Sequence, residues 1–209
     1  MPKILYILGS GSLSLFILSG CIKPRQDNPA PSPLSTCQST TTKTDIYIAG
    51  ATSSEPEQKV MRQVLDGLAR LDSRQITIDR VTGDQLNTIY SNRHDRRAIQ
   101  QVAKQWTIVP VTEKGIVAPF ERIHAIGHSN DDIGIFSKVY IFTAGTSNPD
   151  TLEKIRTAAT TLQGYSCLQV NVIGLDSANR LKMSEALNPI NTKLRFASRD
   201  RQEWQQLID

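Results

Sequence analysis

The sequence lacks the short motifs that mark several large classes of enzyme and metal-binding domain. It has no Gly-x-Ser-x-Gly nucleophile elbow, no Gly-x₄-Gly-Lys-Ser/Thr phosphate loop and no pair of cysteines at zinc-finger spacing. Each motif supplies one chemistry: an exposed nucleophile, a cradle for phosphates, or part of a tetrahedral metal site. Their absence argues against elbow-type hydrolases, P-loop nucleotide-binding proteins and zinc fingers.

A small group of potential metal ligands remains in the middle of the chain. His124 and His128 are four residues apart, and Asp131 and Asp132 follow closely. Two histidines at this spacing can share a metal on a helix, but Gly127 and the neighbouring Ser and Asn argue against a helix here. We therefore prefer a loop or core histidine and keep a small hydrolase or metalloenzyme as an alternative.

The chain also lacks an apolar run long enough to span a membrane. Residues 4–18 are almost continuously apolar, broken only by Gly and Ser, whereas a spanning helix needs about 20 such residues. Lys3 precedes the run, and Lys23 follows it closely. This layout is typical of a cleaved signal peptide, which we place at residues 1–20.

The end of this segment, Leu18-Ser19-Gly20-Cys21, resembles the lipobox of bacterial lipoproteins. The resemblance implies that the Cys21 thiol is joined to diacylglycerol and that its new amine is acylated, for example with palmitate. Several acyl chains on one residue suffice for stable anchoring. We therefore expect a lipid-anchored bacterial protein with its domain on the extracytoplasmic side. Ile22 replaces the aspartate that retains many lipoproteins in an inner membrane, which leaves inner and outer membrane both open.

Residues 21–44 form a tether rich in Pro, Ser and Thr, and apolar residues almost vanish from it. Such sequence buries too little surface to fold, so we expect it to extend and hold the domain away from the bilayer. Cys37 lies in this tether and Cys167 lies in the domain. Outside the cytoplasm the two cysteines could form a disulfide, and free thiols are an equal alternative.

The sequence has no long run of residues with the same charge. The formal net charge is +4, and the clearest basic stretch, Arg93-His94-Asp95-Arg96-Arg97, is interrupted by an acid. A solvated helix start explains this stretch better than nucleic-acid binding, so we expect no nucleic-acid partner. A weak preference for anionic lipid or polymer is as much as the charge supports.

From Asp45 onward, strand-like and helix-like segments alternate. Ser54-Glu55-Pro56-Glu57 is a capping box with Pro just inside the helix start. We expect strands at residues 46–50, 75–81, 107–112, 139–143, 168–173 and 194–197. We expect helices at residues 54–71, 98–106, 148–162 and 178–187 and from 198 onward, and we leave 113–134 unassigned.

This alternation predicts one α/β domain over residues 45–209, with a doubly wound, mainly parallel sheet flanked by helices in a Rossmann-like arrangement. Ligands of such sheets bind beyond the carboxyl ends of the strands. The loops after the first and fourth strands therefore hold the candidate partner-binding or anion-binding residues. They are Thr52, Ser53, Ser54, Thr143, Thr146 and Ser147.

Three strand-end segments, YIAGATS at 47–53, YIFTAG at 140–145 and VIGL at 172–175, together with the order of elements, resemble a von Willebrand factor A domain. The family usually binds a divalent ion through Asp-x-Ser-x-Ser after the first strand, a Thr in a middle loop and an Asp after the fourth strand. The ion then grips a carboxylate of the partner. Gly127-His128 is our candidate for the middle-loop position.

The resemblance also implies that the metal site is degenerate. Of the first motif only Ser53 matches, and the fourth-strand aspartate is replaced by Ala144. Hydroxyls alone do not offset the dehydration of Mg²⁺, so we expect no metal and no other cofactor. The surviving hydroxyls then cap helices, or the exposed amides accept an anionic group directly.

These observations favour a noncatalytic, membrane-tethered adhesion or scaffold module. Its partner is an unidentified protein or other surface, and His128 is included among the candidate contacts. The hydrolase or metalloenzyme is the first alternative to this function, and a small-ligand-binding lipoprotein is the second. It ranks lower because such proteins usually have two lobes, and this chain has length for one.

Overall fold

The computed structural model describes residues 42–48, 55–70, 75–93, 95–105, 111–132 and 136–208. The expected signal peptide, the expected lipidation site Cys21 and residues 22–41 of the expected tether lie outside these residues, whereas the last three residues of that tether, 42–44, belong to the first strand. None of the described helices is both long and apolar enough to cross a membrane.

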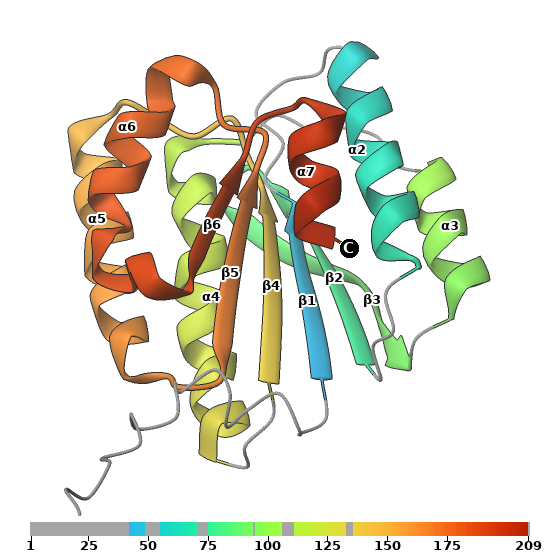
Figure 1. The fold of residues 1–209 in the computed structure, drawn as a ribbon, viewed down its shortest axis with the longest axis horizontal. Helices are drawn as coiled ribbons and strands as arrows, with labels where there is room; N and C mark the ends of the chain where they lie inside the picture. Colours follow the sequence, from blue (N-terminus) through green and yellow to red (C-terminus); the bar gives the residue numbers. More distant parts are fainter. Residues whose placement is uncertain are drawn as a thin grey trace, which may run out of the picture. The chain divides into compact units, whose positions relative to one another are not determined.

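Six strands form a single sheet with the order β3-β2-β1-β4-β5-β6 (Figure 1). The strands are β1 Thr42–Ile48, β2 Gln75–Thr82, β3 Gln85–Arg93, β4 Phe136–Phe142, β5 Leu168–Ile173 and β6 Leu194–Ala197. All neighbouring strands pair in parallel except β3, which runs antiparallel to β2 at the edge. The mainly parallel, doubly wound sheet expected from the sequence is confirmed.

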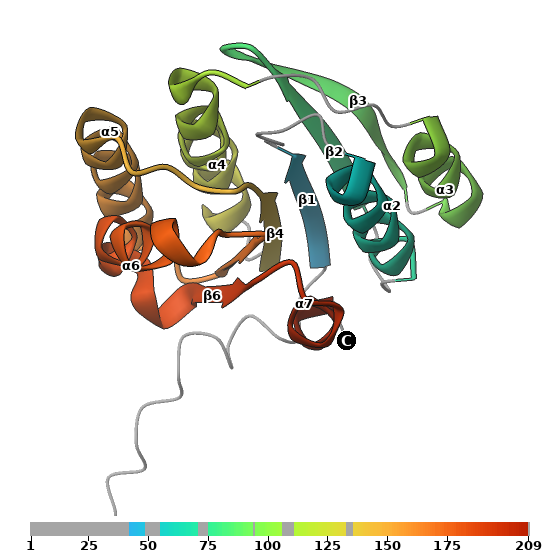
Figure 2. The same cartoon turned by 90° about the horizontal axis from the view of Figure 1, so that it is seen from above.

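Helices cover both faces of the sheet. They are α2 Glu55–Leu68, α3 Arg96–Gln105, α4 Glu113–Asp132, α5 Pro149–Thr161, α6 Ser177–Ala186 and α7 Arg201–Ile208, with short 3₁₀ turns η1 Leu162–Gly164 and η2 Asn188–Lys193. Helices α4, α5 and α6 lie on one face, and α2, α3 and α7 lie on the other (Figure 2). This arrangement follows from right-handed crossovers between parallel strands.

Two hydrophobic cores form because side chains alternate along each strand. In β4, Val139 and Ile141 face the core under α4, α5 and α6, whereas Tyr140 and Phe142 face the core under α2 and α7. The Tyr140 hydroxyl donates a hydrogen bond to the Leu207 carbonyl over 3.2 Å, which joins the central strand to the last helix. Burial raises the pKa of Tyr140 to about 12.

The segment between β2 and β4 differs most from expectation. Strand β3 was not predicted, because an exposed edge strand needs no alternation of apolar residues, and six of its nine side chains are exposed. At the expected strand 107–112, residues 106–110 lie outside the description, and Val111 forms an isolated parallel bridge with Gly83. The unassigned stretch 113–134 is mostly the long helix α4, despite Pro119 inside it.

Candidate functional site

The carboxyl ends of the strands meet at one edge of the sheet, beside the N-termini of α4, α5 and α6. The expected candidates Thr143, Thr146 and Ser147 lie here, in the loop from β4 to α5. Thr52, Ser53 and Ser54 lie outside the described residues. The geometry of this edge therefore rests on three loops: the approach to α4, the β4–α5 loop and the β5–α6 loop.

The hydroxyls of the β4–α5 loop are used to hold the loop itself. Thr143 Oγ1 accepts a hydrogen bond from the Gly145 amide over 3.1 Å, and Thr146 Oγ1 accepts one from the Asn148 amide over 3.0 Å. Both threonines are buried, whereas Ser147 is exposed. Asn148 then caps α5 through its side-chain oxygen, which accepts from the amides of residues 150 and 151. The two threonines therefore hold turns within the loop, and the cap of α5 is Asn148 rather than either threonine.

The fourth strand ends without an acidic side chain. Ala144 stands where the resemblance leads one to expect an aspartate, and its carbonyl accepts hydrogen bonds from the Asp176 amide and the Asn179 side chain, each over 3.2 Å. Gly145 follows in the left-handed region, with φ of 78°. A Cβ there would lie 2.8 Å from Leu175, so the tight turn leaves no room for a larger side chain.

A carboxylate reaches this edge from α4 instead. Glu113, the first residue of α4, accepts a hydrogen bond from Thr146 Oγ1 over 2.7 Å. The contact joins residues 33 positions apart and ties the start of α4 to the β4–α5 loop. Sequence reasoning missed Glu113, because it lay in the unassigned stretch and only the sheet order brings it here.

The residue preceding α4 is also a threonine. Thr112 Oγ1 donates to Asp84, which lies in the turn between β2 and β3, and accepts from the Gly115 amide over 3.2 Å. Lys114 lies 3.8 Å from the same Asp84 carboxylate. Thr112 therefore clamps the β2–β3 turn to the helix start, a role that its position in the sequence did not reveal.

The structure places Gly127 and His128 inside α4 rather than in a loop. His128 is fifteen residues after Glu113, which is roughly 22 Å at a helical rise of about 1.5 Å per residue. The expectation that this pair occupies the middle-loop position of the strand-end site is therefore wrong. Continuous hydrogen bonding along α4 outweighs the weak helix preference of its glycines.

Charged groups around the β5–α6 loop are paired. Asp176 lies 3.1 Å from Arg199, and Arg180 lies 3.8 Å from Glu203. The Ser198 amide donates to the Glu203 carboxylate over 2.8 Å, and this hydrogen bond holds the pKa of Glu203 below its usual range. Among the described residues, no group of three or more His, Cys, Asp or Glu side chains is arranged to hold a metal ion.

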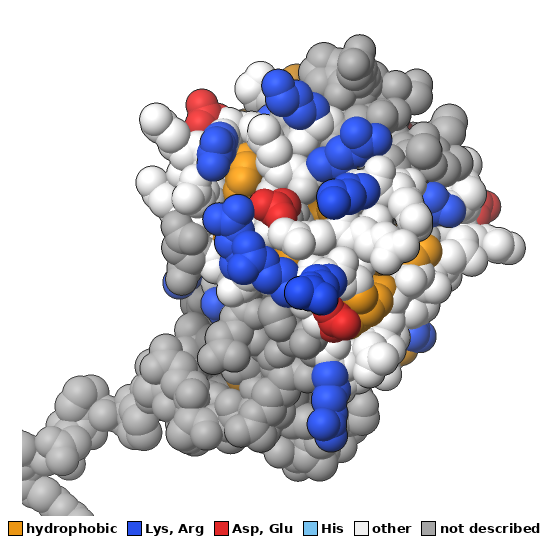
Figure 3. Space-filling model, turned by 90° about the vertical axis from the view of Figure 1, so that its right-hand side faces the viewer, with side chains coloured by type: hydrophobic (Ala, Val, Ile, Leu, Met, Phe, Trp, Pro, Cys, Tyr) orange, Lys and Arg blue, Asp and Glu red, His pale blue; other side chains and the backbone are white. Residues whose placement is uncertain are grey.

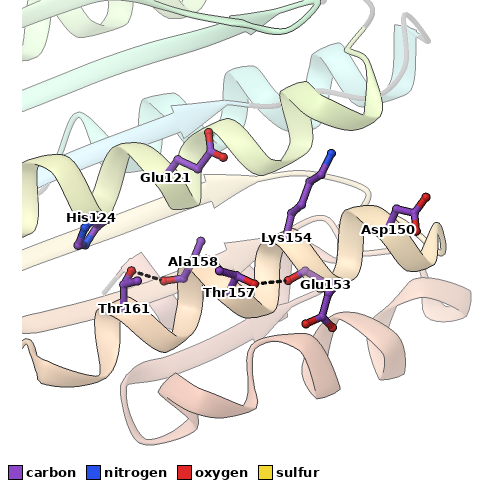
Figure 4. A pocket seen from close by; sticks show the side chains of 8 residues that line it. All are labelled: Glu121, His124, Asp150, Glu153, Lys154, Thr157, Ala158 and Thr161. Atoms are coloured by element: carbon purple, nitrogen blue, oxygen red, sulfur yellow. Dashed lines mark hydrogen bonds between the residues drawn. The ribbon is translucent and has the colours of Figure 1, made fainter.

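An open groove of about 600 Å³ runs between α4 and α5, from Asp150 in the first turn of α5 to Thr161 at its end (Figure 4). Its lining includes Glu121 and His124 of α4 and Asp150, Glu153, Lys154 and Thr157 of α5. His124 Nδ1 is 3.0 Å from the Tyr165 hydroxyl, and the two rings stack with centroids 6.2 Å apart. His124 is thus oriented by a buried tyrosine. The side chains of His128, Asp131 and Asp132 lie outside the description.

One buried carboxylate belongs to neither place. Asp79 of β2 is fully buried, and neither of its carboxylate oxygens has a hydrogen-bond partner in the described structure. It sits at an irregularity in the pairing of β2 with β3, next to Ile78. Its register neighbour on β1 is Tyr47. No sequence motif singled out this residue.

Cys167 lies at the opposite, amino-terminal edge of the sheet. It is disulfide-bonded, and its partner cysteine lies outside the described residues. Its carbonyl accepts a hydrogen bond from the Ser137 amide over 2.8 Å, and its side chain packs against Phe136 at the start of β4.

No protein-family model matches the chain, and no curated protein matches it significantly. In structure it is similar to an aerotolerance-related membrane protein from Bacteroides fragilis, with a TM-score of 0.53 and 11% identity over 81% of this chain and 96% of that one. It is also similar to a von Willebrand factor type A protein from Catenulispora acidiphila, with a TM-score of 0.53 and 13% identity over 80% of this chain and 42% of that one. At these identities the likeness concerns the fold, which is von Willebrand factor A-like.

Proposed function

We propose that this chain is a lipid-anchored, extracytoplasmic interaction module that binds a protein partner through the carboxyl edge of its sheet without a divalent metal. The observation that carries the proposal is the end of β4. Ala144 supplies no carboxylate there, and the neighbouring Thr143 and Thr146 hydroxyls already accept hydrogen bonds from loop amides. The nearby Glu113 carboxylate already accepts a hydrogen bond from Thr146, so a divalent ion would find few free oxygens at the end of β4.

The exposed groups of the edge favour polar contacts with a partner. Ser147 and Glu113 are exposed, and Glu113 is held by Thr146 beside the start of α4. A carboxylate in a fixed orientation attracts a basic or amide group of a partner. A metal-loaded site, in contrast, would bind a carboxylate of the partner. We infer that this edge binds a basic or amide group of its partner, whereas metal-dependent members of the resembled family bind a carboxylate.

The anchor rests on the sequence that ends at Cys21. If Cys21 carries lipid, Cys37 is the remaining cysteine for the disulfide of Cys167. Cys37 lies five residues before β1, a reach of up to about 17 Å. The starts of β1 and β5 are two strand spacings apart, about 10 Å, because β4 lies between them. The proposed disulfide would fix the tether at the amino edge, with the carboxyl edge pointing away from it.

The groove between α4 and α5 supports the alternative functions. His124 lines this groove together with Glu121 and Lys154, and its imidazole ring is oriented by the Tyr165 hydroxyl. Helical geometry also meets the spacing condition for a metal shared by His124 and His128. Zinc in the purified protein by elemental analysis, or a rise in melting temperature with a metabolite, would favour these alternatives.

Site-specific photo-crosslinking in cells tests the proposed function. A photoreactive residue replaces Ser147 at the carboxyl edge and, as a matched control, exposed Gln163 near the opposite edge. We expect a discrete adduct from position 147 that persists with EDTA and is lost on Glu113→Ala. Adducts of equal yield from both positions, or an adduct that EDTA abolishes, would contradict the proposal. Mass spectrometry of the same preparation tests lipid on Cys21 separately.

A further inference from the structure

The outer surface of α2 and α3 carries an excess of positive charge. Lys59, Arg62 and Arg70 recur at helical spacing along α2 and the turn after it, and all are exposed. Arg96, Arg97 and Lys104 are exposed on α3. We call these six side chains the basic face. Lys and Arg side chains gather on this side of the molecule (Figure 3).

The two helices form one surface because Asp66 links them. Its carboxylate accepts a hydrogen bond from the Gln100 side chain over 2.7 Å and pairs with Arg70 over 2.9 Å. The Gln100 hydrogen bond is the main reason that the pKa of Asp66 is lowered, and Arg70 and Arg96 lower it further. Arg96 on α3 and Arg70 in the turn after α2 thus act on the same carboxylate, and Arg96 has the weaker effect.

The described acids near the basic face are already engaged. Asp66 is paired as above, and Asp95 accepts hydrogen bonds from the amides of Arg97 and Ala98 at the start of α3. The six basic side chains outnumber Asp66 and Asp95, so the described side chains of this surface keep a net positive charge, and a smaller excess remains when Glu55 and Glu57 at the start of α2 are counted. This charge spreads over two neighbouring helices, and the groove between α4 and α5 lies on the other face of the sheet.

We propose that the basic face docks on the anionic phospholipid headgroups of the bilayer that carries the anchor. A broad positive surface fits an extended negative surface, and each Lys or Arg near anionic lipid adds to the attraction. Among the described side chains, the large hydrophobic residue that is strongly exposed is Leu181, which lies on α6 and not on the basic face. The contact with lipid is therefore electrostatic, and it is weak by itself.

This inference rests on the proposed anchor for its effective concentration. The 21 residues from Cys21 to Thr42 span at most roughly 70 Å, so an anchored domain never leaves the neighbourhood of the headgroups. A weak contact becomes populated under such tethering. Docking through a side of the domain leaves the carboxyl edge of the sheet accessible to a partner.

Lysine footprinting of the full chain tests the proposal. The protein purified from membranes is placed in nanodiscs of phosphatidylcholine alone or mixed with phosphatidylglycerol, and acetylation rates are read by mass spectrometry. We expect Lys59 and Lys104 to react several-fold more slowly in anionic nanodiscs, and high salt to remove the protection. Lys154 on α5 and Lys182 on α6, which are also exposed, serve as internal controls and should not change.

A charge-reversed variant provides the second arm. Arg96→Glu with Arg97→Glu should abolish the protection, and acidic residues in the first turn of α3 favour that helix, so the variant should fold. Lys154→Glu with Lys182→Glu is the matched control and should retain it. Equal acetylation in neutral and anionic nanodiscs would overturn the proposal.

Two further results would separate docking on lipid from binding to a polymer and from failure of the anchor. Protection of Lys59 and Lys104 by a soluble polyanion such as heparin, without protection by anionic nanodiscs, would overturn the membrane proposal in favour of a polymer. Loss of the chain from both kinds of nanodisc, with unlipidated Cys21 in the mass spectrum, would instead show that the anchor has failed.

Discussion

At the scale of single residues, Asp66 shows how a surface carboxylate can join two helices. Its pKa lies below the usual value of 3.8 because Gln100 and Arg70 stabilise the charged form. A carboxylate with a lowered pKa stabilises the fold at pH values above its unfolded pKa, and this stabilisation disappears as the pH falls through the folded pKa. The group is partly exposed, so solvent screening keeps the effect small.

We therefore expect Asp66→Asn to lower the free energy of unfolding by about 0.5 kcal/mol at neutral pH. The difference from the parent should vanish in acid below the folded pKa, where Asp66 is protonated in both states. Urea unfolding at several pH values measures it. A difference that stays the same in acid would show that packing, rather than charge, explains the loss.

Asp79 illustrates the opposite case, a buried carboxylate with no hydrogen-bond partner in the described structure. Leaving a buried polar group unsatisfied costs about 1–3 kcal/mol, so Asp79→Val, of similar size, should raise the free energy of unfolding by a comparable amount. Thr77→Val is the matched control on the same strand. Thr77 lies 3.4 Å from the Ser91 hydroxyl, and this variant should gain nothing. Destabilisation by Asp79→Val would reveal a partner for the carboxylate.

At the scale of elements, the start of α4 depends on close contact with the β2–β3 turn. A Cβ at Gly115 would lie 2.1 Å from the Gly83 carbonyl oxygen, 2.7 Å from Val111 and 2.9 Å from Val81. Glycine at this position lets the helix begin beside the turn, where Thr112 and Lys114 meet Asp84.

Gly115→Ala should consequently destabilise the protein by about 1–3 kcal/mol, because the backbone of the turn must move. Gly164→Ala is the control, since no atom lies within 4 Å of a Cβ built there. Thermal unfolding of both variants compares them. Equal melting temperatures for the two would mean that the turn and α4 are not in contact.

Elements also show what the sequence could predict. Strands 168–173 and 194–197 match β5 and β6, because buried parallel strands are short apolar runs between helices. Edge strand β3 carried no such signal, since its exposed side chains are polar. Helix α4 was hidden by Gly115, Pro119 and Gly127, whose helix preferences are overridden by packing of residues such as Phe120 in the core.

Part of the candidate site could also be predicted from the sequence. The strand-end rule located Thr143 and Thr146 at the carboxyl edge, because that rule depends only on where a parallel strand stops. The Glu113–Thr146 contact and the Thr112–Asp84 clamp join distant parts of the chain, and they required the sheet order. Asp79 required knowledge of burial, which no motif supplies.

At the scale of the whole molecule, the fold separates two edges of one sheet. Cys167 and the start of β1, to which the tether leads, lie at the amino edge, and the β4–α5 loop and the starts of α4 and α6 lie at the carboxyl edge. We propose that the carboxyl edge recognises a partner without a divalent metal.

Calorimetric titration of Mg²⁺ and Mn²⁺ into the full chain in detergent tests that claim most directly. We predict heats no larger than those of dilution up to millimolar ion, because Ala144 offers no carboxylate and Thr143 and Thr146 are occupied by loop amides. Saturable binding that Ser53→Ala or Thr112→Ala abolishes, and that Ser166→Ala at the opposite edge leaves intact, would contradict it.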